Sequence, residues 1–204
     1  MKTRPILFRA PMVRAILAGQ KTQTRRIVNH PLAQAAVRIH SCKGQSEFDC
    51  ILSDGGGGII KCPYGAPGDR LWVRETWAHE RDGTSCPDDT GILYRATDSG
   101  WDDEDTGLRW RPSIFMPRWA SRITLEITRV LVERLQEISD ADARAEGIAD
   151  GGCLNCGESE PCGCADPAPD ARDAFAWLWQ SIHGSNSWHA NPFVWVIEFR
   201  REVG

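Results

Sequence analysis

The residues of this chain best suited to chemistry lie in one short polar stretch near its N-terminus. Residues 19–26 read Gly-Gln-Lys-Thr-Gln-Thr-Arg-Arg and place an ammonium, two hydroxyls and two guanidiniums within six consecutive positions. A lysine with a lowered pKa can act as a base, and a hydroxyl needs a neighbouring base to become a nucleophile. Lys21 and Thr24 are therefore candidates for base-assisted nucleophilic chemistry. The alternative is a solvated basic turn with no chemical role.

The segment before this stretch predicts a helix that would deliver these groups at its end. Gly19 stands where a helix C-cap glycine belongs, so we expect the helix to stop there and residues 21–28 to turn and enter a strand. The apolar residues on one predicted helix face are Met12, Val13, Ile16 and Leu17.

Patterns along the rest of the chain predict an α+β fold. Strands are expected near 71–77, 92–96, 121–135 and 193–200, and helices near 139–146 and 170–182. The apolar face of the last helix is expected to carry Phe175, Leu178, Trp179 and Ile182. A slip in the apolar alternation near Thr128 indicates a β-bulge. Because strands and helices do not alternate regularly, we expect a small curved or closed sheet with helices at its ends.

Length and composition fit one domain with insertions. The chain has 204 residues, of which 41% are hydrophobic and 25% charged, as is ordinary for a globular protein. We expect a single domain over 1–204, with insertions at 29–61, 79–107 and 149–169. The first of them is expected to be irregular, with the glycine run 55–58 marking a loop. Neither a membrane span nor a signal peptide is recognisable, so a cytoplasmic location without membrane contact is expected.

Basic residues are concentrated in two acid-free stretches. The first 40 residues carry eight basic and no acidic residues, although the net charge of the chain is −4. In the second stretch, 108–122, arginines including Arg118 are interleaved with aromatic residues including Trp119. Guanidiniums beside aromatic rings suit phosphates and stacked bases, which favours a nucleic-acid partner. The alternative is an aromatic core rimmed by arginines.

A cluster of four cysteines and one glutamate on an apolar strand face are two further candidates for a chemical role. The four cysteines of the Gly/Pro-rich segment 149–169 predict a structural Zn²⁺ site, because Cys-x2-Cys is a good half-site for tetrahedral zinc. The second half, Cys-x-Cys, is tighter than usual, and a loop with free thiols is the alternative. Glu75 lies on the apolar side of a predicted strand, where it is either a functional buried acid or a salt-bridged one. The four cysteines are Cys153, Cys156, Cys162 and Cys164.

Four short motifs in a shared order resemble ASCH-domain proteins. The first is Gly-x-Lys-x-x-Thr-x-Arg at 19–26, after a short helix. It is followed by Pro-Gly-Asp at 67–69, Ala-x-x-Glu-Gly at 143–147 and the closing Trp-Val-Ile-Glu-Phe at 195–199. The resemblance implies a PUA-like small β-barrel with flanking helices and loop insertions. The whole chain also resembles ASCH-like proteins of bacteriophages and prophages.

One branch of this superfamily is similar to N(4)-acetylcytidine amidohydrolases, and it implies a catalytic set of Lys21, Thr24 and Glu146. The expected activity is removal of an acyl group from a modified base in a nucleoside or nucleic acid, RNA more than DNA. Without catalysis, the chain would be an RNA- or DNA-binding module or a phage accessory protein. The candidate substrate-binding residues are Arg25, Arg26, Glu75, Arg118 and Trp119.

Overall fold

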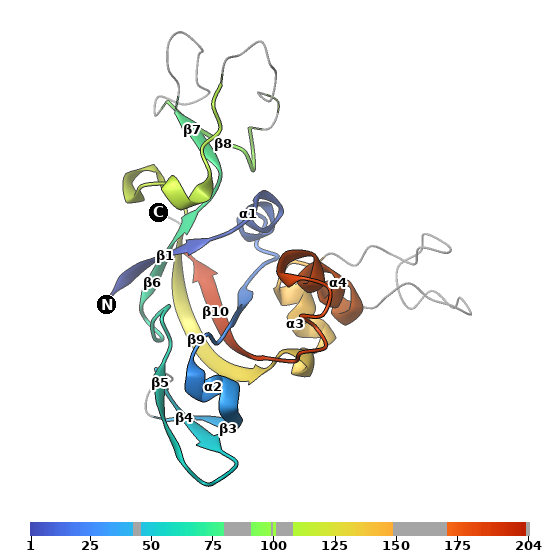
Figure 1. The fold of residues 1–204 in the computed structure, drawn as a ribbon. Coiled ribbons are helices and arrows are strands. Elements are labelled where there is room, and N and C mark those ends of the chain that lie inside the picture. Colours follow the sequence, from blue (N-terminus) through green and yellow to red (C-terminus); the bar gives the residue numbers. More distant parts are fainter. Residues whose placement is uncertain (43–45, 80–90, 99, 101–107, 149–170, 203–204) are drawn as a thin grey trace, which may run out of the picture.

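The fold is built on one central sheet of five strands (Figure 1). The computed structural model describes residues 1–42, 46–79, 91–98, 100, 108–148 and 171–202. The strand order is β1-β6-β9-β10-β2, with β1 and β6 parallel and the other pairs antiparallel. Within the described residues, β1 and β2 are the two edges. The strands are β1 (Thr3–Leu7), β2 (Gln23–Ile27), β6 (Arg70–Arg74), β9 (Thr124–Arg134) and β10 (Phe193–Arg201).

Two small sheets and short helices surround the central sheet. Figure 1 shows the β3-β4-β5 sheet at one end of the molecule, the β7-β8 pair at the other, and α3 and α4 side by side. The small strands are β3 (Ala36–Ser41), β4 (Glu47–Leu52), β5 (Gly57–Lys61), β7 (Trp77–His79) and β8 (Ile92–Tyr94). The helices are α1 (Ala10–Leu17), α2 (Pro31–Ala35), α3 (Asp140–Ala145) and α4 (Ala171–His183), with 3₁₀ turns η4 (Ser113–Phe115), η5 (Arg118–Ala120) and η6 (Leu135–Glu137). The α+β class is confirmed.

Strand β9 carries the predicted bulge. Ile127 pairs with Phe199 and Arg129 pairs with Glu198, so Thr128 is the extra residue between two paired positions. The bulge turns the next side chain back inward: Val130 is fully buried, as Ile127 is. An extra residue of this kind bends a strand and increases its twist, and Figure 1 shows β9 strongly curved.

The expectation that residues 29–61 are irregular is wrong. Helix α2 and the β3-β4-β5 sheet occupy this region, and Ile39, Phe48 and Ile60 pack into the main core. The glycine run is not all loop either, because β5 begins at Gly57. A Cβ at Gly57 would lie 2.1 Å from the Cys50 carbonyl oxygen, so close strand packing requires glycine there.

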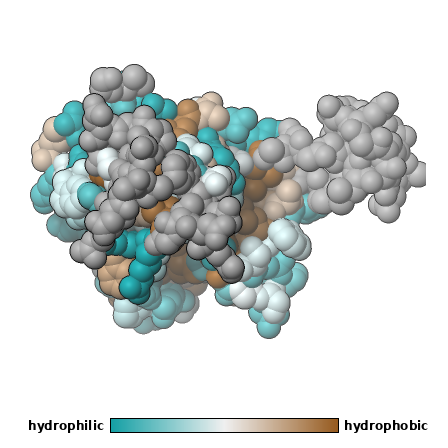
Figure 2. Space-filling view, turned by 90° about the horizontal axis from the view of Figure 1, so that it is seen from above, coloured by the Kyte–Doolittle hydropathy of each residue, from teal (hydrophilic) through white to brown (hydrophobic). Residues whose placement is uncertain are grey.

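The surface combines polar areas with single exposed apolar side chains. The described atoms in Figure 2 are mostly hydrophilic, with smaller hydrophobic areas between them. The most exposed large apolar side chains include Trp177, Phe115 and Trp119. In the described part of the chain, no helix is long and apolar enough to cross a membrane.

Helix α3 begins with a reciprocal cap at Ser139. The Ser139 hydroxyl accepts a hydrogen bond from the Asp142 N–H, and the Asp142 carboxylate accepts one from the Ser139 N–H. We predict that Ser139→Ala lowers the free energy of unfolding by about 1 kcal/mol, because this capping bond is lost. Ser181→Ala, on the exposed face of α4, is the matched control and should change it by less than about 0.5 kcal/mol. Equal denaturation midpoints for both variants would contradict the capping role.

Candidate functional site

A cavity of about 230 Å³ lies where α1, α3 and α4 meet the ends of β1 and β2. It brings together Lys21, Thr24 and Glu146, the three residues expected to be catalytic, although Glu146 is 125 positions from Lys21. Arg25 and Arg26, two of the expected substrate-binding residues, also line it. The full lining is Leu7, Phe8, Arg9, Pro11, Met12, Lys21, Thr24, Arg25, Arg26, Glu146, Phe175, Leu178, Trp179, Ile182 and His183.

The turn that carries Lys21 is fixed between the ends of two helices. Gly19 has φ +73°, a conformation that favours glycine, and it reverses the chain after α1. The backbone N–H groups of Gln20 and Lys21 both donate to the Ala15 carbonyl, at 2.9 and 3.1 Å. The Thr22 N–H then donates to the carbonyl of Ala145, at the end of α3, over 2.9 Å. The turn with Lys21 is therefore held against α3.

Glu146 is positioned by the way α3 ends. The Gly147 N–H donates to the Arg144 carbonyl, and the Ile148 N–H donates to the Ala143 carbonyl. This is the Schellman arrangement, in which a left-handed residue follows the helix. Gly147 is that residue, with φ +87°. The motif fixes the Glu146 backbone at the cavity.

Lys21 and Glu146 form a buried ion pair. The Lys21 ammonium donates to the Glu146 carboxylate over 2.5 Å and to the Glu146 backbone carbonyl over 2.7 Å. The two residues are only 3% and 5% exposed. Burial lowers the pKa of Lys21, because desolvation disfavours the charged form, and the Glu146 carboxylate opposes this shift. The cationic side chains of Arg26 and Arg25 lower the pKa of Lys21 further.

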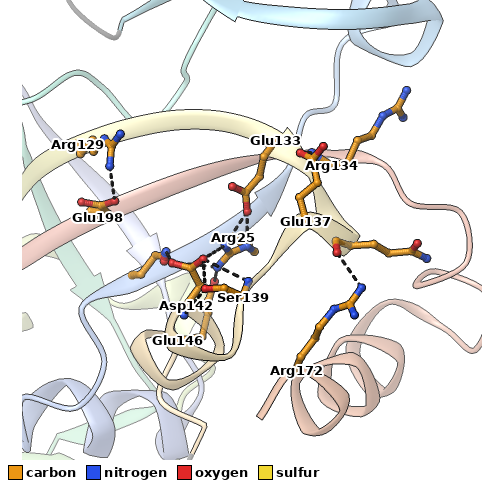
Figure 3. Close-up of polar contacts among 12 residues, drawn as sticks. Arg25, Arg129, Glu133, Arg134, Glu137, Ser139, Asp142, Glu146, Arg172 and Glu198 are labelled. Carbon is orange, nitrogen blue, oxygen red and sulfur yellow. Dashed lines mark hydrogen bonds and ion pairs between the residues drawn. The ribbon is translucent and has the colours of Figure 1, made fainter. Parts of the chain in front are cut away.

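Arg25 links Glu146 to two other acids. Its Nη2 lies 2.6 Å from Glu133 and 3.6 Å from Asp142, and its Nη1 lies 3.5 Å from Glu146. Figure 3 shows these carboxylates converging on the guanidinium. Burial raises the pKa of Glu133, and the charge of Arg25 opposes that shift. Arg25 thus orients Glu146, while its expected contact with substrate stays a prediction.

Arg26 and Thr24 have polar atoms that no protein group satisfies within the described residues. Arg26 donates from Nη2 to the Leu7 carbonyl over 2.7 Å, and its guanidinium lies 5.3 Å from the centre of the Phe8 ring. Its Nε is buried and has no hydrogen-bond partner within the described residues. The Thr24 hydroxyl likewise makes no hydrogen bond in the described part of the chain.

One wall of the cavity is apolar and aromatic. Helix α4 contributes Phe175, Leu178, Trp179 and Ile182, which are the residues that the sequence places on one helix face. Nε1 of Trp179 is buried without a partner among the described residues. Sequence reasoning missed His183, whose ring centre lies 4.3 Å from that of Trp179. Helical spacing from Trp179 was the available signal for His183.

Sequence reasoning also missed Arg9, at the other side of the opening. Burial, and then the charges of Arg26 and Arg9, lower the pKa of His183. No spacing rule connects Arg9 with α4, since their shared place at the cavity depends on how the chain folds back. Arg9 and His183 are both exposed, so they lie at the rim of the cavity.

Three expected substrate-binding residues lie outside this cavity. Glu75 is buried, and both of its carboxylate oxygens accept from Arg122 at 3.0 Å, so it is the salt-bridged acid of the two alternatives. Burial raises the pKa of Glu75, and Arg122 opposes the shift. Trp119 is 66% exposed and packs edge-on against Trp77. Arg118 lies over the Trp72 ring, and a substrate contact for these residues stays a prediction.

The predicted zinc ligands Cys153, Cys156, Cys162 and Cys164 lie outside the described residues, as do the insertion at 149–169 and much of that at 79–107. Within the described ranges, no group of three or more His, Cys, Asp or Glu side chains could hold a metal ion. The zinc site therefore stays a prediction from spacing alone.

Gly147 is packed so tightly that its substitution should disturb Lys21. A Cβ at this position would lie 3.0 Å from the Ala15 Cβ and 3.2 Å from the Lys21 Cβ. We predict that Gly147→Ala lowers the free energy of unfolding by about 1–3 kcal/mol, from the strained φ and this crowding together. The matched control is Gly184→Ala, which also has a positive φ but open space around it. Calorimetry should show the smaller loss for Gly184→Ala, and equal losses would contradict the crowding of Lys21.

Comparison with protein-family models, curated proteins and solved structures finds no match for this chain. What the site does must therefore be argued from its own residues. These are a buried Lys–Glu pair, a hydroxyl and two donors without partners among the described residues, and an aromatic wall around one small cavity.

Proposed function

We propose that this protein is an amidohydrolase that removes an acyl group from the exocyclic nitrogen of a modified base such as N(4)-acetylcytidine. The observation that carries the proposal is the meeting of Lys21, Thr24 and Glu146 in one cavity, with Lys21 Nζ 2.5 Å from the Glu146 carboxylate. A base, a nucleophile and an acid in one small site match the needs of amide hydrolysis.

The size and lining of the cavity favour a single base as the part of the substrate that enters. Its volume of about 230 Å³ lies below the range of about 300–1,000 Å³ that is usual for drug-sized ligands. The aromatic rings of Phe8, Phe175 and Trp179 line it, and aromatic walls suit stacking of a flat ring. In a nucleic acid, the modified base would have to leave its stack to enter.

In the proposed reaction, Thr24 Oγ attacks the acyl carbonyl while Lys21 takes the hydroxyl proton. The carbon–nitrogen bond then breaks, and this proton passes to the exocyclic nitrogen of the leaving base. The acyl group remains on Thr24 as an ester, which water hydrolyses with Lys21 again as the base. The products are the free amine and a carboxylic acid, so no further reactant is needed.

The proposed reaction needs Lys21 as a neutral amine when it takes the hydroxyl proton, and the ion pair with Glu146 is the resting arrangement. A neutral amine has two N–H groups and one lone pair, and two acceptors of Glu146, its carbonyl and its carboxylate, face Nζ. The lone pair is then left for the hydroxyl proton. Burial favours this neutral state because it lowers the pKa of Lys21. Glu146 fixes the amine in place and receives or returns the proton during turnover.

Two unpartnered donors are suited to the substrate's oxygen atoms. Nε of Arg26 and Nε1 of Trp179 are both buried without a partner among the described residues, and both residues line the cavity. Nε1 of Trp179 would serve the developing oxyanion, because a donor that is already fixed and desolvated stabilises it strongly. Arg26 would bind another oxygen of the substrate. We assign substrate binding to Arg26 on this basis.

We also propose that the sheet is a PUA-like barrel of the ASCH type. Its two edge strands approach each other at the cavity, where the Arg26 side chain of β2 donates to the Leu7 carbonyl at the end of β1. Strongly curved strands of this kind suit a small barrel whose edges are joined by side chains.

A second candidate function, binding of RNA or DNA, is favoured by a separate surface. Arg111 lies 5.0 Å over the ring of Trp77, and the neighbouring Trp119 is exposed. Exposed aromatic rings beside guanidiniums suit single-stranded nucleic acid. Binding through this surface should weaken as salt rises and should weaken further in Trp119→Ala, whereas salt-independent binding would exclude it.

The experiment that tests the hydrolase compares two nearby threonines, Thr24 of β2 and Thr22 of the turn before it. We predict that Thr24→Val lowers the rate of cytidine release from N(4)-acetylcytidine by about tenfold or more, because water must then replace the nucleophile. The matched control is Thr22→Val, since Thr22 is exposed and does not line the cavity. Chromatography of the nucleosides gives both rates. Equal rates for the two variants would remove Thr24 from the reaction.

A further inference from the structure

We infer that the rim of the cavity, at Arg9, Arg26 and His183, is a phosphate subsite, so that the substrate is a nucleotide rather than a free nucleoside. This inference rests on the proposed function for the identity of the base. The phosphate is either the monoester of a free nucleotide or the diester of a strand, since both present the same charged oxygens.

The charges around the cavity are unbalanced. Among the described residues that line it, Glu146 is the only acid, and it is already paired with Lys21 and Arg25. Neither Arg9 nor Arg26 has a carboxylate partner in the described part of the chain. Two guanidiniums without counter-charges at one opening attract an anionic ligand.

Arg26 has one N–H group that donates to no protein acceptor among the described residues. Its Nη2 is used by the Leu7 carbonyl, but its buried Nε has no partner among the described residues. A buried polar atom without a partner is costly unless a ligand or water satisfies it. Arginine binds phosphate through two neighbouring N–H groups, which makes a phosphate oxygen a fitting acceptor.

Arg9 lies at the positive end of a helix. It is the N-cap residue of α1, has no capping bond from its side chain, and is followed by a first turn without acidic residues. Arg9, Pro11 and Met12 line the cavity, so this helix end faces it. A cation at a helix N-terminus is unfavourable alone, whereas an anion between them is stabilised by both.

The geometry of the cavity agrees with a phosphate at its rim. The interior has room for one base, so the sugar and its phosphate must lie at the opening. Arg9 and His183 are the exposed polar residues there, and the His183 ring is held against Trp179. The charges of Arg26 and Arg9 help to lower the pKa of His183, and a phosphate between them would offset this repulsion.

The main test compares N(4)-acetylcytidine 5′-monophosphate with N(4)-acetylcytidine. In the wild type, kcat/KM should be about tenfold or more higher for the nucleotide, the difference that one charged contact supplies. Arg9→Gln should reduce this ratio to near one. The control Arg38→Gln removes another exposed arginine, on β3 and outside the cavity, and should leave the ratio unchanged. Equal kcat/KM values for nucleotide and nucleoside in the wild type would overturn the inference for the monoester.

Two further experiments distinguish failure of the phosphate subsite from failure of the proposed hydrolase. An RNA oligonucleotide with one N(4)-acetylcytidine should be preferred over the nucleoside if the subsite binds a diester, and no preference for either phosphate form would overturn the subsite. Binding of inorganic phosphate, followed by ³¹P NMR, does not depend on turnover. Phosphate binding that Arg9→Gln abolishes, without turnover of any acylated compound, would reject the hydrolase and keep the anion subsite. Turnover of the acylated nucleoside without phosphate binding, and without preference for a phosphorylated substrate, would keep the hydrolase and reject the phosphate subsite.

Discussion

Replacing Lys21 by methionine is expected to lower kcat for N(4)-acetylcytidine by about 10³-fold, within the range of about 10²–10⁴ that general bases supply. The variant should also lower the free energy of unfolding by about 3–5 kcal/mol. Both effects have one cause: the Lys21 amine makes two hydrogen bonds with Glu146 inside the protein. Methionine fills similar space but leaves the Glu146 carboxylate buried, with the 3.5 Å contact to Arg25 as its remaining ion pair among the described residues.

The double variant Lys21→Met/Glu146→Gln separates these two effects. It removes both charges, so denaturant unfolding should show that much of the lost stability returns, because buried pairs can be replaced with little net cost. Its kcat should stay as low as that of Lys21→Met. Activity that returns together with stability would mean that Lys21 only supports the fold.

Replacing Glu146 by glutamine is expected to lower kcat by about 10²-fold and to shift the pH profile. If neutral Lys21 is the base, activity rises with pH through the pKa of Lys21. The Glu146 carboxylate raises this pKa, against the larger lowering by burial. Removing that charge must lower the pKa further, so the rising limb of kcat against pH moves to lower pH.

A matched control shows whether this shift is local. Glu126→Gln also removes one carboxylate, but Glu126 pairs with Arg200 away from the cavity. Its profile should overlie that of the wild type. A shift of Glu146→Gln to higher pH would contradict the assignment of neutral Lys21 as the base.

Local patterns predicted the elements that build the site. The apolar spacing before Gly19 predicted α1 and its end, and the slip at Thr128 predicted the bulge in β9. The helical face of Phe175 and Trp179 was also predicted. These features depend on neighbours a few residues away, which is the range that sequence patterns report directly.

Contacts between residues far apart in the sequence were harder to predict. The resemblance, not the spacing, placed Glu146 beside Lys21, and Glu75 was grouped with the site although it pairs with Arg122. Residues 29–61 were misread because their strands are short and the glycine run between β4 and β5 resembles a loop, although β5 begins at Gly57. Arg9 and His183 line the same cavity because of how the chain folds back, which no local pattern encodes.

The central claim is that Lys21, Thr24 and Glu146 form one amide-hydrolysing site, and product stoichiometry tests it most directly. Wild-type protein is incubated with N(4)-acetylcytidine and with its 5′-monophosphate, and the deacylated product and acetate are both quantified beside the folded Lys21→Met/Glu146→Gln variant. We predict equimolar deacylated product and acetate from the wild type and neither from the variant. No release of acetate from either compound by folded wild-type protein, or equal release by the double variant, would contradict the account.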